Sequence, residues 1–105
     1  MGLDNEMKSQ IKQRAIVNVR GVVQGVGFRP FIYRLATMHY LFGWVRNTSG
    51  QVEMEVEGNE TEINCFLQEL ETQAPPMARI EHIRTTFSSP AGYTAFQIKE
   101  SLAQR

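Results

Sequence analysis

Three observations on this 105-residue chain predict an α+β fold. In this fold, two helices lie on one face of an antiparallel sheet of four to five strands. Several short segments alternate apolar and polar residues, which is typical of half-buried strands. Two longer segments place apolar residues at helical spacing. Glycine and proline separate these segments in the order β-α-β-β-α-β, followed by one more strand. This order matches the ferredoxin-like sandwich.

The first strand and the first helix are expected in the first half of the chain. Alternation begins at Ala15, and the strand ends at Gly21. Pro30 suits the first position of a helix, because its missing N–H would have no partner there. Gly43 is expected to end that helix. The apolar face of the helix is predicted to contain Phe31, Leu35, Met38 and Phe42.

A hairpin and a second helix are expected next. The hairpin joins residues 43–48 to residues 51–57 through Ser49-Gly50. Either Asn59 or Thr61 can cap the following helix. The apolar stripe of that helix is predicted to contain Ile63, Phe66, Leu67 and Leu70.

A chain of this length can build one hydrophobic core, so we expect one domain, over residues 15–99. The last two strands are predicted at residues 80–87 and 94–98, after Pro75-Pro76 ends the second helix. Residues 1–14 are polar without a sustained period, which indicates a disordered leader or a tag remnant. Residues 100–105 are expected to be a C-terminal tail.

Composition limits the classes of function. Eleven basic and eleven acidic residues cancel, which argues against a general nucleic-acid or membrane surface. Residues 51–77 hold seven glutamates and no lysine or arginine, which either keeps carboxylates away from an anionic substrate or forms an ordinary solvated face. The single cysteine, Cys65, excludes an internal disulfide, and we expect it to be partly buried and inert. No signal peptide or membrane span is evident, so a cytoplasmic location is expected.

The segment between the first strand and the first helix has the features of a phosphate cradle. Gly21, Gly25 and Gly27 space this loop, and Arg29 follows at its end. Glycine lets backbone N–H groups approach a ligand, and successive N–H groups can form an anion-binding nest. The first turn of a helix adds unpaired donors, and arginine adds a planar charged fork. Alternatively, the glycines only serve a tight turn.

This segment resembles the acylphosphatase signature Gly-x-Val-Gln-Gly-Val-x-Phe-Arg. Its matching residues are Gly21, Val23, Gln24, Gly25, Val26, Phe28 and Arg29. A second block of the family stands at residues 43–47, as Gly-Trp-Val-Arg-Asn. Pro30-Phe31 and residues 75–80 are most similar to the N-terminal acylphosphatase-like domain of nickel–iron hydrogenase maturation carbamoyltransferases.

The resemblance implies a role for individual residues. Arg29 matches the catalytic arginine that binds phosphate, and Asn47 matches the asparagine that orients the attacking water. No metal ion and no cofactor are implied, and inorganic phosphate or sulfate can occupy the site. The backbone cradle corresponds to Val23, Gln24, Gly25, Val26, Gly27 and Phe28.

The implied activity is hydrolysis of acyl phosphates to a carboxylate and phosphate. The carboxylate is a good leaving group, so positioning and charge stabilisation can suffice. In the carbamoyltransferase context, the chain would be a module that handles carbamoyl phosphate; the alternative is a free-standing small acylphosphatase. A more remote alternative is a non-catalytic module that binds an anion or RNA, but Glu53, Glu55 and Glu57 do not suit an RNA-binding face.

Four other polar residues could lie near this loop or serve the structure. Arg20 is expected either beside the cradle or opposite a cross-strand glutamate. Arg46 should point to the other face of the sheet from Asn47. His39 and His82 have no spacing typical of metal ligands, and we expect them to be structural or exposed.

Overall fold

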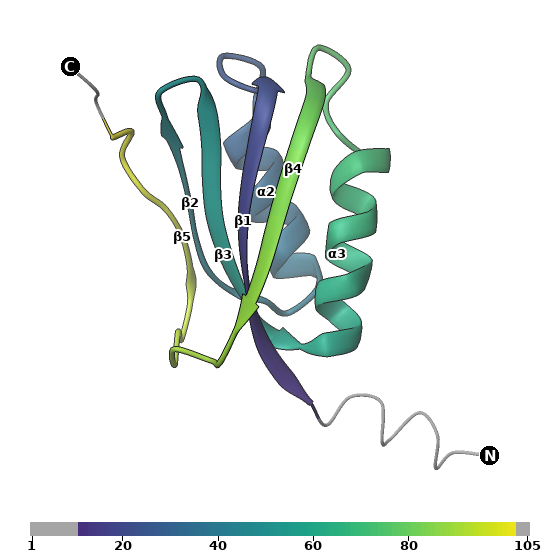
Figure 1. Ribbon diagram of the computed structural model, residues 1–105, viewed down its shortest axis with the longest axis vertical. Helices are drawn as coiled ribbons and strands as arrows, with labels where there is room; N and C mark the ends of the chain where they lie inside the picture. Colours follow the sequence, from purple (N-terminus) through teal and green to yellow (C-terminus); the bar gives the residue numbers. More distant parts are fainter. Residues whose placement is uncertain (1–10, 103–105) are drawn as a thin grey trace.

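The computed structural model describes residues 11–102, which form one five-stranded sheet with two helices on one face (Figure 1). The strands lie in the order β4-β1-β3-β2-β5. In chain order the elements are β1 (Lys12–Val22), α2 (Phe28–Met38), β2 (Phe42–Thr48), β3 (Gln51–Asn59), α3 (Glu60–Thr72), β4 (Arg79–Ser88) and β5 (Phe96–Ile98).

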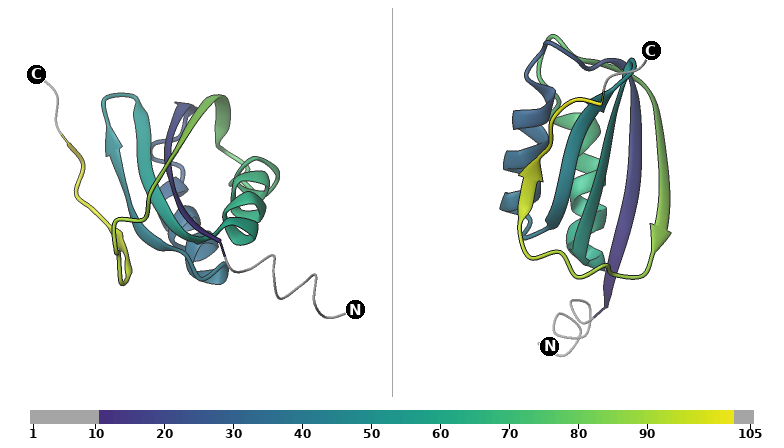
Figure 2. Two further views of the ribbon diagram at one scale, coloured as in Figure 1. Left: turned by 60° about the horizontal axis from the view of Figure 1, so that its bottom comes forward. Right: turned by 90° about the vertical axis from the view of Figure 1, so that its left-hand side faces the viewer.

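The predicted ferredoxin-like architecture is confirmed, but the prediction of a purely antiparallel sheet is wrong. The β1–β3, β1–β4 and β2–β3 pairs are antiparallel, whereas β5 runs parallel to β2. The reason is the path of residues 89–95, which leave β4 at one edge and pass to the other edge (Figure 2). A chain that crosses the end of the sheet in this way re-enters in the direction of β2.

The predicted boundaries shift by a few residues. β1 begins at Lys12 rather than Ala15, and Arg14 already belongs to the sheet, where its guanidinium binds Glu55 at 2.9 Å. The remaining leader residues 1–10, and residues 103–105 of the tail, lie outside the described part of the chain. The tail residue Leu102 donates its main-chain N–H to the carbonyl of Asn47, at 2.9 Å.

The core lies between the sheet and the helices. Alternate residues of each central strand point toward the helices, as the sequence pattern predicts. Burial of each large apolar side chain stabilises the fold by about 2 kcal/mol. The fully buried residues with the largest side chains include Phe28, Ile32, Leu41, Met54, Ile63, Phe66 and Leu70.

Two features of the helices bear on the predictions. Asn59 occupies the N-cap of α3, but its side chain makes no capping hydrogen bond. Cys65 is exposed, contrary to expectation, because its position in α3 points it away from the stripe that includes Ile63 and Phe66. Neither helix is long and apolar enough to cross a membrane.

Candidate functional site

The loop between β1 and α2 depends on glycine for its conformation. Gly25 has φ of 73° and Gly27 has φ of 78°, in the left-handed region where a side chain is disfavoured. Gly27 is the N-cap of α2 and turns the chain into the helix. The loop is therefore a tight connection, with its tip open around Gly25 and Gly27, where an added Cβ would meet no atom within 4 Å.

The N-terminus of α2 leaves main-chain donors without partners. No side chain caps it, and its first turn holds no acidic residue. The first helical hydrogen bond runs from the Phe31 N–H to the Gly27 carbonyl, at 3.2 Å. The N–H groups of residues 23–29 donate no hydrogen bond to any residue in the described range. Such a terminus attracts anions, because its donors and its dipole both favour negative charge.

The side chain of Gln24 ties this loop to the turn between β2 and β3. Its amide Nε2 donates to the carbonyl of Thr48 at 2.6 Å and to the carbonyl of Gln51 at 2.9 Å. The loop is thereby held against the end of the strand that carries Asn47. Because Nε2 of Gln24 is engaged in both bonds, its main-chain N–H is the donor left for an anionic ligand.

Asn47 lies near the end of β2 and faces the helix layer. Its cross-strand partner is Val52, which is fully buried on that face. The Oδ1 atom of Asn47 is buried and has no hydrogen-bond partner within residues 11–102. An unpaired buried amide oxygen is unfavourable unless a water or a ligand binds it. Asn47 therefore has an acceptor available at this end of the sheet.

Arg29 lies in the first turn of α2 and is half-buried. Its guanidinium forms no hydrogen bond or ion pair with another described residue, unlike that of Arg14 or Arg46. A guanidinium presents five donors in a planar fork that suits phosphate oxygens. Arg29 is thus a charged group that no carboxylate of residues 11–102 neutralises.

The β1–α2 loop, the start of α2 and the β2–β3 turn lie at the same end of the molecule (Figure 1). The structure thus brings the predicted loop, Arg29 at the start of α2 and Asn47 near the end of β2 to this end. Arg46 points to the open face, as expected, where it binds Glu53 at 3.3 Å. Arg20 lies on the open face opposite Gln51 and His82, without an ion pair to a glutamate among residues 11–102, so the expected cross-strand glutamate partner is wrong.

The remaining titratable residues are engaged elsewhere or exposed. His39 is structural, since its ring contacts Glu62 at 2.7 Å and Glu69 at 2.9 Å, and His82 is exposed. Three glutamates of residues 51–77 lie on the open face of β3, and the other four lie on α3. The described residues contain no group of three histidine, cysteine or acidic side chains arranged for a metal ion.

Two contacts of the site were missed by sequence reasoning. The anchoring of the loop by the Gln24 side chain depends on the distance to the β2–β3 turn, for which the sequence carries no signal. The hydrogen bond from Leu102 to the Asn47 carbonyl depends on the parallel placement of β5. The first contact holds the main chain of the predicted loop, and the second holds the main chain at Asn47.

Comparison with known proteins gives a consistent result. The family model described as acylphosphatase matches residues 15–98. A carbamoyltransferase HypF from Rhizobium leguminosarum is 47% identical over 103 residues, which are 98% of this chain and 13% of that protein. An acylphosphatase from Moorella thermoacetica is 42% identical over 90 residues, which are 85% of this chain and 96% of that protein.

A solved structure of full-length HypF, in a phosphate- and nucleotide-bound form, superimposes with a TM-score of 0.86 at 35% identity. The match covers 89% of this chain and 12% of that one. The chain thus spans only a small part of the carbamoyltransferases it resembles, but nearly the whole of a small acylphosphatase.

Proposed function

Because the chain belongs to the acylphosphatase family, we propose that it hydrolyses acyl phosphates at the loop between β1 and α2. The main-chain N–H groups of residues 23–28 bind the phosphoryl oxygens. Arg29 closes the site with its guanidinium and stabilises the charge on those oxygens. Asn47 holds the attacking water.

The proposed reaction needs binding and orientation more than acid–base chemistry. The water oxygen attacks phosphorus, and the bond between phosphorus and the acyl oxygen breaks. The electron pair of that bond leaves with the carboxylate, and the proton lost by the water passes to phosphate or solvent. Oδ1 of Asn47 accepts a hydrogen bond from the water, and this orients a lone pair of the water oxygen toward phosphorus.

The observation that supports this proposal best is the pair of unengaged groups at one end of the sheet. The guanidinium of Arg29 and the buried Oδ1 of Asn47 have no partners among the residues described, and Gln24 holds the loop between them in place. The unpaired guanidinium of Arg29 suits an anionic substrate, and the unpaired Oδ1 of Asn47 suits a water molecule that donates to it.

The first prediction concerns this pair. Turnover of a small acyl phosphate, such as acetyl phosphate, should proceed in the presence of a metal chelator. Arg29→Ala and Asn47→Ala should each lower kcat/KM by about 10²-fold or more, because each removes a contact to the reacting groups. The rate of phosphate release measures this effect, and circular dichroism shows whether the fold is retained.

Matched variants make this test specific. Arg34→Ala removes an exposed arginine one turn further along α2. Asn59→Ala removes an asparagine at the other end of β3, whose Oδ1 is likewise buried and unpaired. Both controls should retain turnover. Undiminished rates in the Arg29 and Asn47 variants, or loss of activity on chelation, would contradict the proposed roles.

The substrate that we propose for the carbamoyltransferase context is carbamoyl phosphate, itself an acyl phosphate. Its hydrolysis releases carbamate, which decomposes to carbon dioxide and ammonia. The 47% identity to a carbamoyltransferase over almost the whole chain favours this context. The 42% identity to a small acylphosphatase is also consistent with the alternative, a free-standing acylphosphatase. A cytoplasmic location remains a prediction in both.

The natural reading frame distinguishes these two contexts. Continuation into cysteine-rich zinc motifs would support a module of a larger enzyme, and a stop codon after residue 105 would support the free-standing enzyme. The RNA-binding alternative has little support, because the open-face residues of the central strands β1 and β3 include no aromatic side chain.

A further inference from the structure

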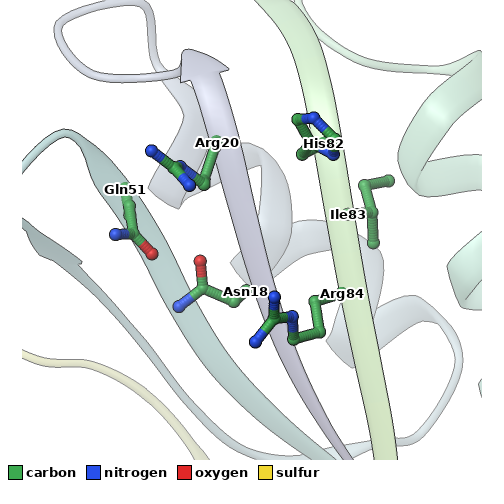
Figure 3. Close-up of a pocket in the computed structure, with 6 residues that line it drawn as sticks. All are labelled: Asn18, Arg20, Gln51, His82, Ile83 and Arg84. Carbon is green, nitrogen blue, oxygen red and sulfur yellow. The ribbon is translucent and has the colours of Figure 1, made fainter.

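A polar hollow lies on the open face of the sheet, which neither helix covers (Figure 1). It has a volume of about 450 Å³, a size typical of sites for small molecules. Its polar side chains are guanidinium, amide and imidazole groups, and no carboxylate is among them. The lining residues are Asn18 and Arg20 of β1, Gln51 of β3, and His82, Ile83 and Arg84 of β4 (Figure 3).

Strand register places the polar residues of the hollow in two adjacent rows. Arg20 is the cross-strand partner of both His82 and Gln51, and Asn18 is the partner of Arg84. Neighbouring strands are about 4.8 Å apart, so these donors are close together. Arg20 and Arg84 are diagonal neighbours in this register, about 7–8 Å apart, so their long side chains can reach the same ligand.

The two arginines of the hollow have no salt-bridge partner in the described part of the protein, and the carboxylate that lies opposite Asn18 on this face belongs to Glu53. Neither Arg20 nor Arg84 forms an ion pair or a hydrogen bond there. The glutamates of the same face are already engaged with other groups. Glu53 pairs with Arg46, and Glu55 pairs with Arg14. Glu57 accepts hydrogen bonds from the N–H groups of residues 91–93.

The directions of the side chains favour a shared ligand. In Figure 3, Arg20 leans from β1 toward Gln51, and Arg84 reaches from β4 across β1 toward Asn18. The amide of Asn18 points from β1 toward β3, Gln51 lies on β3, and His82 lies on β4 across β1 from the guanidinium of Arg20. Donors from three strands are therefore arranged around one space.

We propose that this hollow is a second anion site, which binds a small phosphorylated compound. A planar carboxylate pairs bidentately with only one guanidinium fork. A tetrahedral phosphate can present different oxygens to Arg20 and Arg84 at once, and its remaining oxygens can accept from the amides. The hollow thus fits a phosphate group better than a single carboxylate.

This site is separate from the proposed catalytic site. Asn47 faces the helix layer, whereas Arg20 and Arg84 lie on the open face. The two sites share only Gln51, whose side chain lines the hollow and whose carbonyl anchors Gln24. The proposal therefore does not depend on hydrolysis at the loop.

Titration of the ¹⁵N-labelled protein with inorganic phosphate, at constant ionic strength held with sodium chloride, tests the proposal by NMR. Phosphate should produce saturable amide shifts at residues 18, 20, 51, 82 and 84. These shifts should persist in Arg29→Gln, which weakens phosphate binding at the loop. In the double variant Arg20→Gln/Arg84→Gln, the dissociation constant for these shifts should rise at least tenfold.

Arg34→Gln, which removes an exposed arginine outside the hollow, is the matched control and should leave that dissociation constant unchanged. Absence of saturable shifts around the hollow would overturn the proposal, as would equal dissociation constants in the double variant and in Arg34→Gln. Absence of shifts at the loop, with those at the hollow retained, would count against the proposed catalytic site alone.

Discussion

At the scale of single residues, the glycines around the loop serve different purposes. An added Cβ at Gly21 would overlap the main-chain carbonyl of Arg79, on the neighbouring strand β4. Gly21 also follows the irregularity in the β1–β4 register, between Arg20 and Gly21. Gly25 and Gly27 meet open space instead, and need glycine only for their positive φ. Gly21 thus allows two strands to approach closely, whereas the other two shape the loop.

This difference predicts unequal losses of stability. Gly21→Ala should lower the free energy of unfolding by about 3 kcal/mol or more, because the Cβ collides with backbone that cannot move freely. Gly50→Ala is the matched control, since Gly50 also has a positive φ, of 69°, but faces open space. It should cost about 1 kcal/mol. Urea unfolding measures both, and equal losses would contradict the close approach.

The sequence carried enough information to select the candidate residues, but not to describe their contacts. The signature and its second block predict Arg29 and Asn47 as site residues, and the structure places both at one end of the sheet. Their catalytic roles remain predictions. The collision at Gly21 and the anchoring by Gln24 depend on neighbours more than twenty positions away, which local patterns do not identify.

At the scale of elements, His39 connects the two helices. It follows α2 directly, and its two ring nitrogens contact Glu62 and Glu69 of α3. A neutral imidazole has only one N–H, so it can donate to one carboxylate, whereas the imidazolium can donate to both. Burial lowers the pKa of His39, but the hydrogen bonds and charges of Glu69 and Glu62 outweigh it, so its pKa is raised above 6.5.

The raised pKa predicts a pH-dependent stability. Protonation of His39 favours the folded state, so its contribution is fully present below pH 6.5 and is lost as the pH rises through the folded pKa. Because the two glutamates are partly exposed, we expect a loss of about 1 kcal/mol at most. Urea unfolding at pH 5.5 and at pH 8 measures it.

Two histidine variants identify the source of this effect. His39→Gln should abolish this part of the pH dependence, whereas His82→Gln should keep it, because His82 is exposed and has no such partners in the described chain. The same pH profile in both variants would show that the link between α2 and α3 is not its origin.

The order of the elements could be predicted from periodicity, but the orientation of β5 could not. Alternation and helical spacing identify strands and helices one at a time. β5 has only three residues, and its parallel pairing with β2 is determined by where residues 89–95 cross. No local pattern in that segment indicates the edge of the sheet to which the chain returns.

At the scale of the whole molecule, one buried carboxylate holds this crossing to the sheet. Glu57 of β3 is only 7% exposed. Its oxygens accept hydrogen bonds from three consecutive N–H groups, at 2.6 Å from Ala91, 2.9 Å from Gly92 and 3.1 Å from Tyr93. The crossing leads into β5, and the chain then continues along β2 as far as the contact between Leu102 and Asn47. Glu57 therefore fastens to the central strand the segment that connects the two edges of the sheet.

Removing this carboxylate should release the C-terminal part of the fold. We expect Glu57→Ala to lower the free energy of unfolding by about 3 kcal/mol, because three partly buried N–H groups lose a charged acceptor. Hydrogen exchange should accelerate at residues 91–93 and at Gly43, Lys99 and Leu102, whose N–H groups bond across the β2–β5 edge. Amides of the β1–β4 pair should keep their relative protection.

Glu53→Ala is the control on the same strand and face. It should lower the free energy of unfolding by no more than about 1 kcal/mol, because the ion pair of Glu53 with Arg46 is partly exposed. Unchanged exchange at residues 91–102 in Glu57→Ala would show that packing of Phe96, rather than this carboxylate, holds the segment to the sheet.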